Sequence, residues 1–290
     1  MTIKERGYSH WDGELKPGKY PWKPITSFGL RLTFKKKFFK FFFVMALIPA
    51  LVFLVGVYVS ERIGDFQSMV NDSNVPLLQV NPAFFKAYYS NEFILFMMVM
   101  MLVFAGAGLI SDDLRSNSLQ LYLARPIARR DYFLGKASIL VFFLFMVTLV
   151  PGLILLIMKL VFAGSIRFLL DYPWLPLSIV GFSLFVTAFF SLYALLLSSL
   201  SKNRRYVAIL IWGLYIFSDI LFGILYGIFR NPYFSLVSIK ADVQQVCAAL
   251  FGQKMFFDVP WGYALAVLGG ACILAVFILQ KRVRGVEIIK

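Results

Sequence analysis

The segment 111–136 mixes apolar residues with charges of both signs and separates two long apolar runs. Ser111, Asp112 or Asp113 can cap a short helix here, because their oxygens accept free backbone N–H groups and negative charge suits the positive helix end. The apolar side of this helix would consist of Leu114, Leu121 and Leu123. Pro126 would end it, since proline cannot donate a helical hydrogen bond.

Two interpretations of this helix follow from the pattern. A short, partly apolar helix outside the hydrocarbon core can lie on the lipid headgroups. It can also protrude into the cytoplasm as a docking site for a partner protein. The residues of the segment fit both.

Catalytic motifs are missing from the sequence. It contains no Gly-x-x-x-x-Gly-Lys-Ser/Thr phosphate loop, no Gly-x-Ser-x-Gly elbow and no His-Glu-x-x-His helix. His10 is the single histidine, and Cys247 and Cys272 lie in different segments, so a His/Cys metal site lacks ligands. We therefore expect no catalytic residue, no metal and no cofactor in this chain, and an intramembrane enzyme is the least favoured class.

Asp219 is the acidic residue with the most unusual surroundings, since it stands near the middle of an apolar run. A carboxylate in that position costs roughly 2.5–3.5 kcal/mol on insertion scales unless it faces protein or water. It is the best candidate for a translocation-pathway residue. The alternatives are a structural hydrogen bond to another helix and a protonated acid.

The composition indicates which kind of structural element positions these residues. Of the 290 residues, 60% are hydrophobic and 15% are charged, whereas soluble domains contain about 45–50% apolar and about 25% charged residues. Apolar runs long enough to cross a bilayer as helices span residues 38–59, 93–110, 137–162, 175–200, 206–229 and 261–279. We predict an all-α polytopic membrane protein with six transmembrane helices and a short turn at 201–205.

Most of the 29 Lys and Arg residues fall in the amino-terminal segment, in 111–136, in the 201–205 turn and in the carboxy-terminal tail. Because cytoplasmic loops carry the excess of Lys and Arg, both termini should be cytoplasmic. This accounts for the basic charge without a nucleic-acid partner. The predicted parts are a cytoplasmic segment 1–37, a membrane domain 38–279 with a cytoplasmic loop 111–136 and an outer loop 230–260, and a tail 280–290.

Two further segments have helical patterns. Residues 24–40 alternate aromatic and aliphatic side chains with lysines and Arg31, which is typical of an interfacial helix bound to lipid. Whether it also contacts a partner is left open by the pattern. In the outer loop, apolar residues between Leu236 and Leu250 recur at near-helical spacing over a length too short to cross.

The loop 111–136 also carries a resemblance to a known family. Acidic residues after the second span, a small-residue pair, a Leu-rich turn, Arg-Pro-Ile, Arg, an acid and Gly-Lys resemble the signature of ABC-2 type ABC-transporter permeases. The matching positions are Leu119, Leu123, Pro126, Ile127, Arg129, Gly135 and Lys136. The sequence departs from the usual wording at Asn117-Ser118, where Gly-Thr is usual, and at Asp131, where Glu is usual.

This resemblance implies the transmembrane subunit of an ATP-driven exporter in the cytoplasmic membrane. Its partners would be two copies of an ATP-binding subunit, which hold ATP and Mg²⁺, a second permease chain and membrane lipids. The loop would form a coupling helix that docks on the ATPase. The residues expected to take part are Asp112, Asp113, Arg115, Leu119, Arg125, Pro126, Arg129 and Arg130.

In that arrangement Asp112, Asp113 and Arg115 would begin the coupling helix, and Arg125, Arg129 and Arg130 would pair with the ATPase or with lipid phosphate. A different class of function stays open, namely an ATP-independent membrane scaffold that uses the loop only for docking. The sequence leaves the substrate undetermined, and it does not distinguish a homodimer from a heterodimer.

Overall fold

The computed structural model describes residues 20–62, 80–118 and 128–282, and the regular secondary structure in these ranges is entirely helical. Within them, six helical stretches are long and apolar enough to cross a membrane: Lys37–Glu61, Pro82–Arg115, Arg129–Ala163, Leu175–Leu200, Arg204–Phe229 and Trp261–Arg282. The predicted all-α fold with six spans is confirmed.

The spans comprise one or more helices each. They are α2 (Lys37–Arg62); α4 (Pro82–Tyr89), α5 (Glu92–Gly106) and α6 (Gly108–Arg115); α8 (Arg129–Val147) and α9 (Leu149–Ala163); α11 (Leu175–Leu200); α12 (Arg204–Phe229); and α14 (Trp261–Arg282). The shorter elements are α1 (Trp22–Phe34), α10 (Arg167–Asp171), the 3₁₀ helix η1 (Pro232–Val237) and α13 (Ile239–Leu250). The break between α11 and α12 lies within the predicted 201–205 turn.

The second span begins earlier than its apolar run indicates, because two asparagines cap successive helices. Oδ1 of Asn81 accepts a hydrogen bond from the N–H of Phe84 at the start of α4. Oδ1 of Asn91 accepts from the N–H of Phe93 at the start of α5. Asparagine is a favoured N-cap since it satisfies backbone donors that have no partner within the helix.

The third span is broken at Thr148, where α8 ends and α9 begins. Pro151 cannot donate the helical hydrogen bond that would reach the carbonyl of Val147. The hydroxyl of Tyr88, from α4, donates to that carbonyl at 2.9 Å. The neighbouring Tyr89 hydroxyl donates to the carbonyl of Thr148 at 3.1 Å. The first helix of span two therefore holds the joint in span three.

A second joint lies in span two at Ala107, between α5 and α6. Oγ of Ser198, on α11, accepts hydrogen bonds from the N–H groups of Ile110 and Ser111 and donates to the carbonyl of Ala107. A side chain that enters the backbone hydrogen-bond ladder is a recognised cause of helix kinks. Span four thus fixes the joint in span two.

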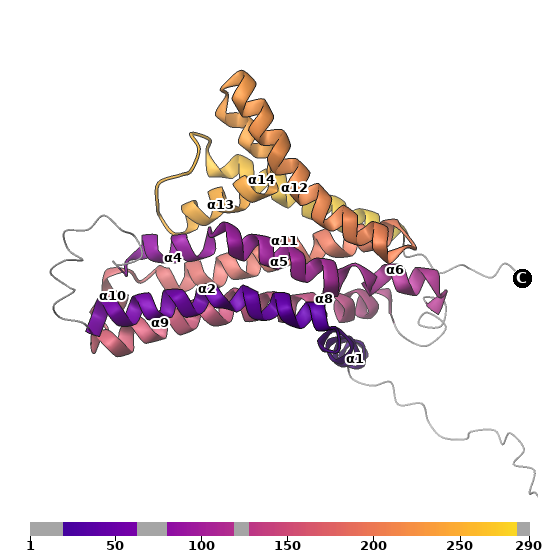
Figure 1. Cartoon of the computed structure of the whole chain (residues 1–290), viewed down its shortest axis with the longest axis horizontal. Helices are drawn as coiled ribbons and strands as arrows, with labels where there is room; N and C mark the ends of the chain where they lie inside the picture. The colour runs from indigo at the N-terminus through magenta and orange to yellow at the C-terminus, as the bar shows by residue number, and fades with distance from the viewer. Residues whose placement is uncertain (1–19, 63–79, 119–127, 283–290) are drawn as a thin grey trace, which may run out of the picture.

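Figure 1 shows two groups of helices. The lower group holds α2, α9, α8, α5 and α11 side by side, with α1 across one end and α4 and α10 at the other. Above it, α12, α13 and α14 form a second group, and the carboxy-terminal part of α12 diverges from the rest. The span ends that the sequence assigns to the cytoplasmic side lie together at one end of the molecule (Figure 1).

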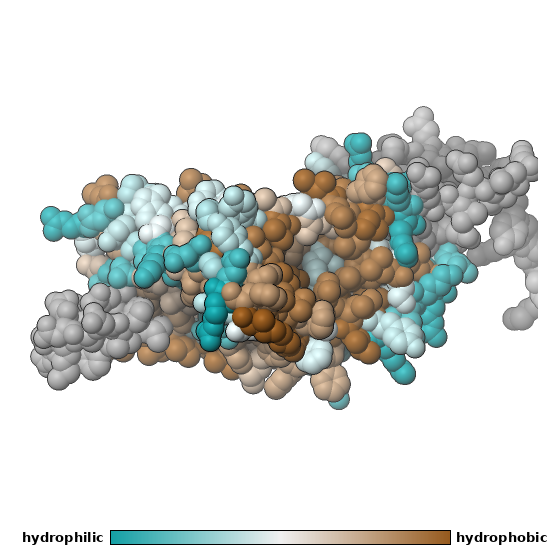
Figure 2. All heavy atoms as spheres, turned by 90° about the horizontal axis from the view of Figure 1, so that it is seen from above, coloured by the Kyte–Doolittle hydropathy of each residue, from teal (hydrophilic) through white to brown (hydrophobic). Residues whose placement is uncertain are grey.

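The outer faces of α12 and α14 are strongly apolar and exposed. Large exposed side chains on them include Ile209, Trp212, Phe217, Ile220, Val267, Ile273 and Phe277. Seen from above the second group, hydrophobic residues form a band across the molecule with hydrophilic residues towards its ends (Figure 2). Such a band suits contact with lipid tails or with another membrane-embedded chain.

Candidate functional site

An ion pair closes the base of the loop between spans two and three. Nζ of Lys136 lies 2.7 Å from Oδ2 of Asp113, and the hydroxyl of Tyr132 donates to the same carboxylate oxygen at 2.7 Å. Ser118 donates to Oδ1 at 3.3 Å. The side chains of Lys136 and Asp113 are only 11% and 15% exposed. The end of α6 is therefore fastened to the first two turns of α8.

The helix expected to start at Asp112 starts earlier, so this part of the prediction is corrected. Helix α6 begins at Gly108 and continues the second span, and no side chain caps it. Ser111 is buried and donates to the carbonyl of Ala107 within the helix. Asp112, Asp113 and Arg115 belong to the last two turns of α6, because the last apolar residues of the span and the first polar residues after them lie in the same helix.

Of these three charged residues, Asp112 and Arg115 are exposed at the end of α6, whereas Asp113 is held in the ion pair. The charge of Asp112 lies close enough to Lys36 to raise the pKa of that lysine. The structure thus separates three residues that the sequence places together: two point to solvent and one joins two spans. Leu119, Arg125 and Pro126 lie outside the described residues.

Gly135 brings the amino-terminal helix α1 against the start of span three. A Cβ atom at this position would lie 2.9 Å from Cβ of Ile25 and 3.1 Å from the carbonyl oxygen of Trp22. Oγ1 of Thr26 donates to the carbonyl of Gly135 at 3.2 Å. The close approach needs glycine because there is no room for a side chain. The Gly-Lys pair of the sequence therefore has two distinct contacts, glycine with α1 and lysine with α6.

Lys36 links the break between α1 and α2 to the second span. Its Nζ donates to the carbonyl of Phe104 at 2.9 Å. Burial and, to a smaller extent, the nearby charge of Arg204 lower the pKa of Lys36 to about 8, against the opposing effect of Asp112. The lysine lies just before the first span, so its charge is held close to the predicted lipid boundary.

Arg129 and Arg130, the first residues of α8, line a groove of about 620 Å³ between α8, α11 and α14. The groove floor is apolar and includes Phe133, Leu195 and Val276. Both arginine side chains are exposed. Their guanidinium groups stand where an apolar surface meets the charged end of the bundle, a setting that suits phosphate or carboxylate binding.

At the opposite end of the bundle, Asp219 contacts the helix that follows span five. Its Oδ1 accepts a hydrogen bond from Ser238 at 3.0 Å, and its Oδ2 lies 2.9 Å from Nζ of Lys240. The same lysine pairs with Glu92 at 3.1 Å. One of the alternatives for Asp219, a hydrogen bond to another helix, is therefore present in the structure.

The partner of Asp219, helix α13, is a buried connecting element. Its residues from Ala241 to Ala248 are all buried, although the sequence pattern also allowed a surface helix. Gln244 donates to the carbonyl of Ser90 at 2.8 Å, and Ser178 donates to the carbonyl of Leu250 at 2.6 Å. Helix α13 thereby joins the starts of spans two and four to span five.

Several residues of these sites were not predicted. Tyr132, Ser198, Ser238 and Lys240 carry no motif, because their role depends on partners that are distant in the chain. Lys240 is a basic residue in a segment assigned to the outer side of the membrane, and this was the one feature of the sequence that could have drawn attention to it. Among the described residues, no group of three His, Cys, Asp or Glu side chains could hold a metal ion.

The profile of the family described as "ABC-2 family transporter protein" matches residues 32–276, which include the first five spans, most of the sixth, and the Asp113–Lys136 and Asp219–Lys240 ion pairs. No curated protein matches the chain.

Proposed function

Because the chain belongs to the ABC-2 family of transporter proteins, we propose that it is the permease subunit of an exporter driven by ATP hydrolysis in a separate subunit. The family and the six apolar helices make it a multi-pass transport protein of a membrane. The proposal adds the cytoplasmic membrane, cytoplasmic termini and an ATP-binding partner that holds ATP and Mg²⁺.

The observation that carries this proposal is the ion pair between Asp113 and Lys136. A partner that pushes on the loop 111–136 moves the end of α6, and the ion pair makes the start of α8 move with it. Since Gly135 packs against α1, the amino-terminal helix follows. The loop is therefore connected to α6, which ends the second span, to α8, which begins the third span, and to α1, which precedes the first span.

The two joints would transmit this movement to the opposite end of the bundle. Displacement of α6 acts on the joint at Ala107, which Ser198 connects to span four. Displacement of α8 acts on the joint at Thr148, which Tyr88 and Tyr89 connect to α4. Helix α4 starts at the end where α13 lies. A change at the ATPase side can thus alter the helices near the opposite surface.

Different residues would recognise the partners. Asp112 and Arg115 are exposed at the end of α6 and are available to an ATP-binding subunit, of which two copies would serve a transporter with two permease chains. Arg129 and Arg130 would bind lipid phosphate or the ATPase. The exposed apolar faces of α12 and α14 would meet lipid or the second permease chain.

Charge reversal of the exposed pair tests the docking role. Asp112→Lys with Arg115→Glu, reconstituted with the ATP-binding subunit, should weaken subunit binding and lower ATP hydrolysis that depends on the permease. The matched control reverses Arg167 and Asp171, which are exposed on α10 at the opposite end. Normal ATPase activity in the Asp112/Arg115 variant would remove this helix end from the docking surface.

A further inference from the structure

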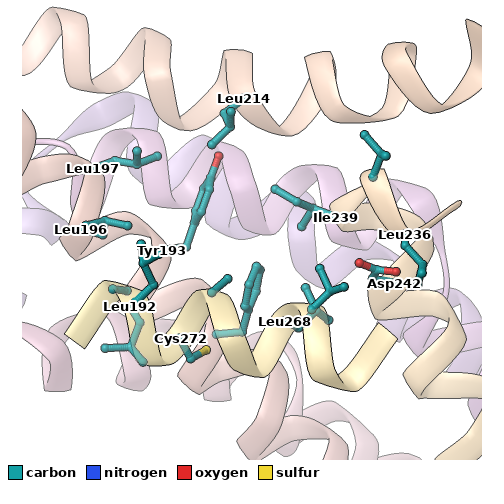
Figure 3. A pocket seen from close by; sticks show the side chains of 16 residues that line it. Leu192, Tyr193, Leu196, Leu197, Leu214, Leu236, Ile239, Asp242, Leu268 and Cys272 are labelled. Carbon is teal, nitrogen blue, oxygen red and sulfur yellow. The ribbon is translucent and has the colours of Figure 1, made fainter. Parts of the chain in front are cut away.

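A cavity of about 200 Å³ lies between the two groups of helices, beside the start of α13. Its walls come from α11, α12, η1, α13 and α14, and most of its lining is aliphatic (Figure 3). Leu214 and Leu274 belong both to the lining and to the exposed apolar faces of α12 and α14. The cavity can therefore be reached from those faces.

One carboxylate lies in this apolar wall. The side chain of Asp242 stands between Leu236 and Leu268 in Figure 3, and the residue is 2% exposed. Within the part of the chain that the structure describes, its carboxylate makes neither a hydrogen bond nor an ion pair. Burial raises the pKa of Asp242 to about 8. An acid so deeply buried without a partner is costly, which points to a ligand that completes the site.

The chemistry of the lining limits what that ligand can be. Apart from Asp242, the polar side chains lining the cavity are Tyr193 and Cys272. The hydroxyl of Tyr193 already donates to the carbonyl of Ile211 at 2.7 Å. Calcium and magnesium need about six oxygen ligands, and a water molecule needs two to four polar partners. Neither finds enough side-chain partners here.

An organic cation satisfies the same lining. Its charge would face the carboxylate in a medium of low dielectric constant, where the attraction is strong, and its apolar part would contact the leucines. Phe189 and Tyr193, whose rings stack at 6.1 Å between centroids, also line the cavity. Aromatic faces attract quaternary ammonium groups.

We propose that this cavity is a binding site for one lipophilic ammonium ion, with Asp242 as its counter-ion. Tyr193 and Cys272 are the other titratable side chains of the cavity. Lys240, two residues earlier on α13, is engaged by Asp219 and Glu92, and Lys86 on α4 donates to the carbonyl of Lys254. The charge that faces the ligand is therefore that of Asp242. The proposal concerns binding to this chain alone and does not rest on the ATPase.

The test is calorimetric titration of hexyltrimethylammonium into the full chain in phosphatidylglycerol nanodiscs, which contain no ammonium headgroups. The probe keeps its charge at every pH, so its affinity should rise about tenfold per pH unit between about pH 6 and pH 8 and then level off. Asp242→Asn should bind at least about tenfold more weakly and lose the pH dependence. Asp258→Asn, an exposed acid outside the cavity, should bind like the wild type.

Equal affinity of the Asp242→Asn variant, or of the neutral analogue hexanol for the wild type, would overturn the proposal. A second measurement leaves Asp242 in place, in case its replacement prevents folding. In a Cys247→Ala background, hexyltrimethylammonium should slow modification of Cys272 by methyl methanethiosulfonate at about pH 8 and protect less at about pH 6. Absence of protection at both pH values would contradict the site, and neither result depends on transport activity.

Discussion

The carboxylate of Asp113 and the ammonium group of Lys136 lie 2.7 Å apart, and this contact joins the last turns of span two to the second turn of span three. The two residues are 23 positions apart, at either side of the loop 116–128. Both side chains are largely buried. Because the pair closes the loop at its base, we expect a force on the loop to act on both spans.

A double-mutant cycle measures this connection. Asp113→Asn and Lys136→Met should each lower both the thermal stability and the permease-dependent ATP hydrolysis, because each removes the opposite charge from a largely buried ion. The double variant should lose less than the sum, with a coupling energy of roughly 0.5–3 kcal/mol. Asp171→Asn, an exposed acid on α10 at the opposite end of the bundle, is the control. Additive effects of the two single changes would mean that the pair transmits nothing.

The packing of α1 on span three depends on Gly135. Gly135→Val should displace α1, since even its Cβ would meet Ile25 at 2.9 Å, and overpacking typically costs about 1–3 kcal/mol. Hydrogen exchange should accelerate in Trp22–Phe34 while the spans stay protected. Gly181→Val is the matched control, because a Cβ there has open space around it. Unchanged exchange in α1 would show that its position does not depend on this contact.

Asp219 should act mainly by holding α13. Asp219→Asn removes the closer of the two carboxylates of Lys240, and the remaining one, Glu92, is 71% exposed. We expect faster hydrogen exchange in Ile239–Leu250 for Asp219→Asn than for Glu92→Gln. The pathway role of Asp219 gives a different pattern: transport would fall in Asp219→Asn while exchange in α13 stays as in the wild type.

Lys36 should make stability depend on pH. Its pKa is lowered to about 8 in the folded chain, so between about pH 8 and pH 10.5 the unfolded chain binds the extra proton and stability rises with pH. This gain in stability is fully present above the pKa of Lys36 in the unfolded chain, 10.5, and is lost as the pH falls through about 8. The difference in apparent Tm between the wild type and Lys36→Met should therefore change in favour of the wild type across this window. A constant difference would show that Lys36 titrates normally.

The sequence was sufficient to predict the spans, because a backbone in hydrocarbon must satisfy its own hydrogen bonds and therefore forms helices wherever the apolar run is long enough. The break between α11 and α12 was equally predictable, since Lys202, Arg204 and Arg205 cannot lie comfortably in lipid. Apolar residues at near-helical spacing also indicated a short helix between Leu236 and Leu250, and α13 occupies most of that stretch.

The joints and ion pairs were beyond sequence reasoning. The break at Ala107 depends on Ser198, which lies 91 residues further along the chain, and the carbonyl freed by Pro151 is satisfied by Tyr88 from another span. Which helices lie side by side decides such contacts, and apolar faces in lipid carry little information about their neighbours. The start of the expected coupling helix was misplaced for a related reason: the apolar residues before Asp112 continue one helix into the polar loop.

Purification of the chain from its native membrane, with identification of the accompanying subunits and measurement of ATP hydrolysis, tests the central claim most directly. We predict a stoichiometric ATP-binding subunit and vanadate-sensitive ATP hydrolysis that falls when Asp113 is changed to Asn, although the subunits still assemble. A complex that contains other membrane proteins and no ATPase would contradict the account and would favour the membrane-scaffold function.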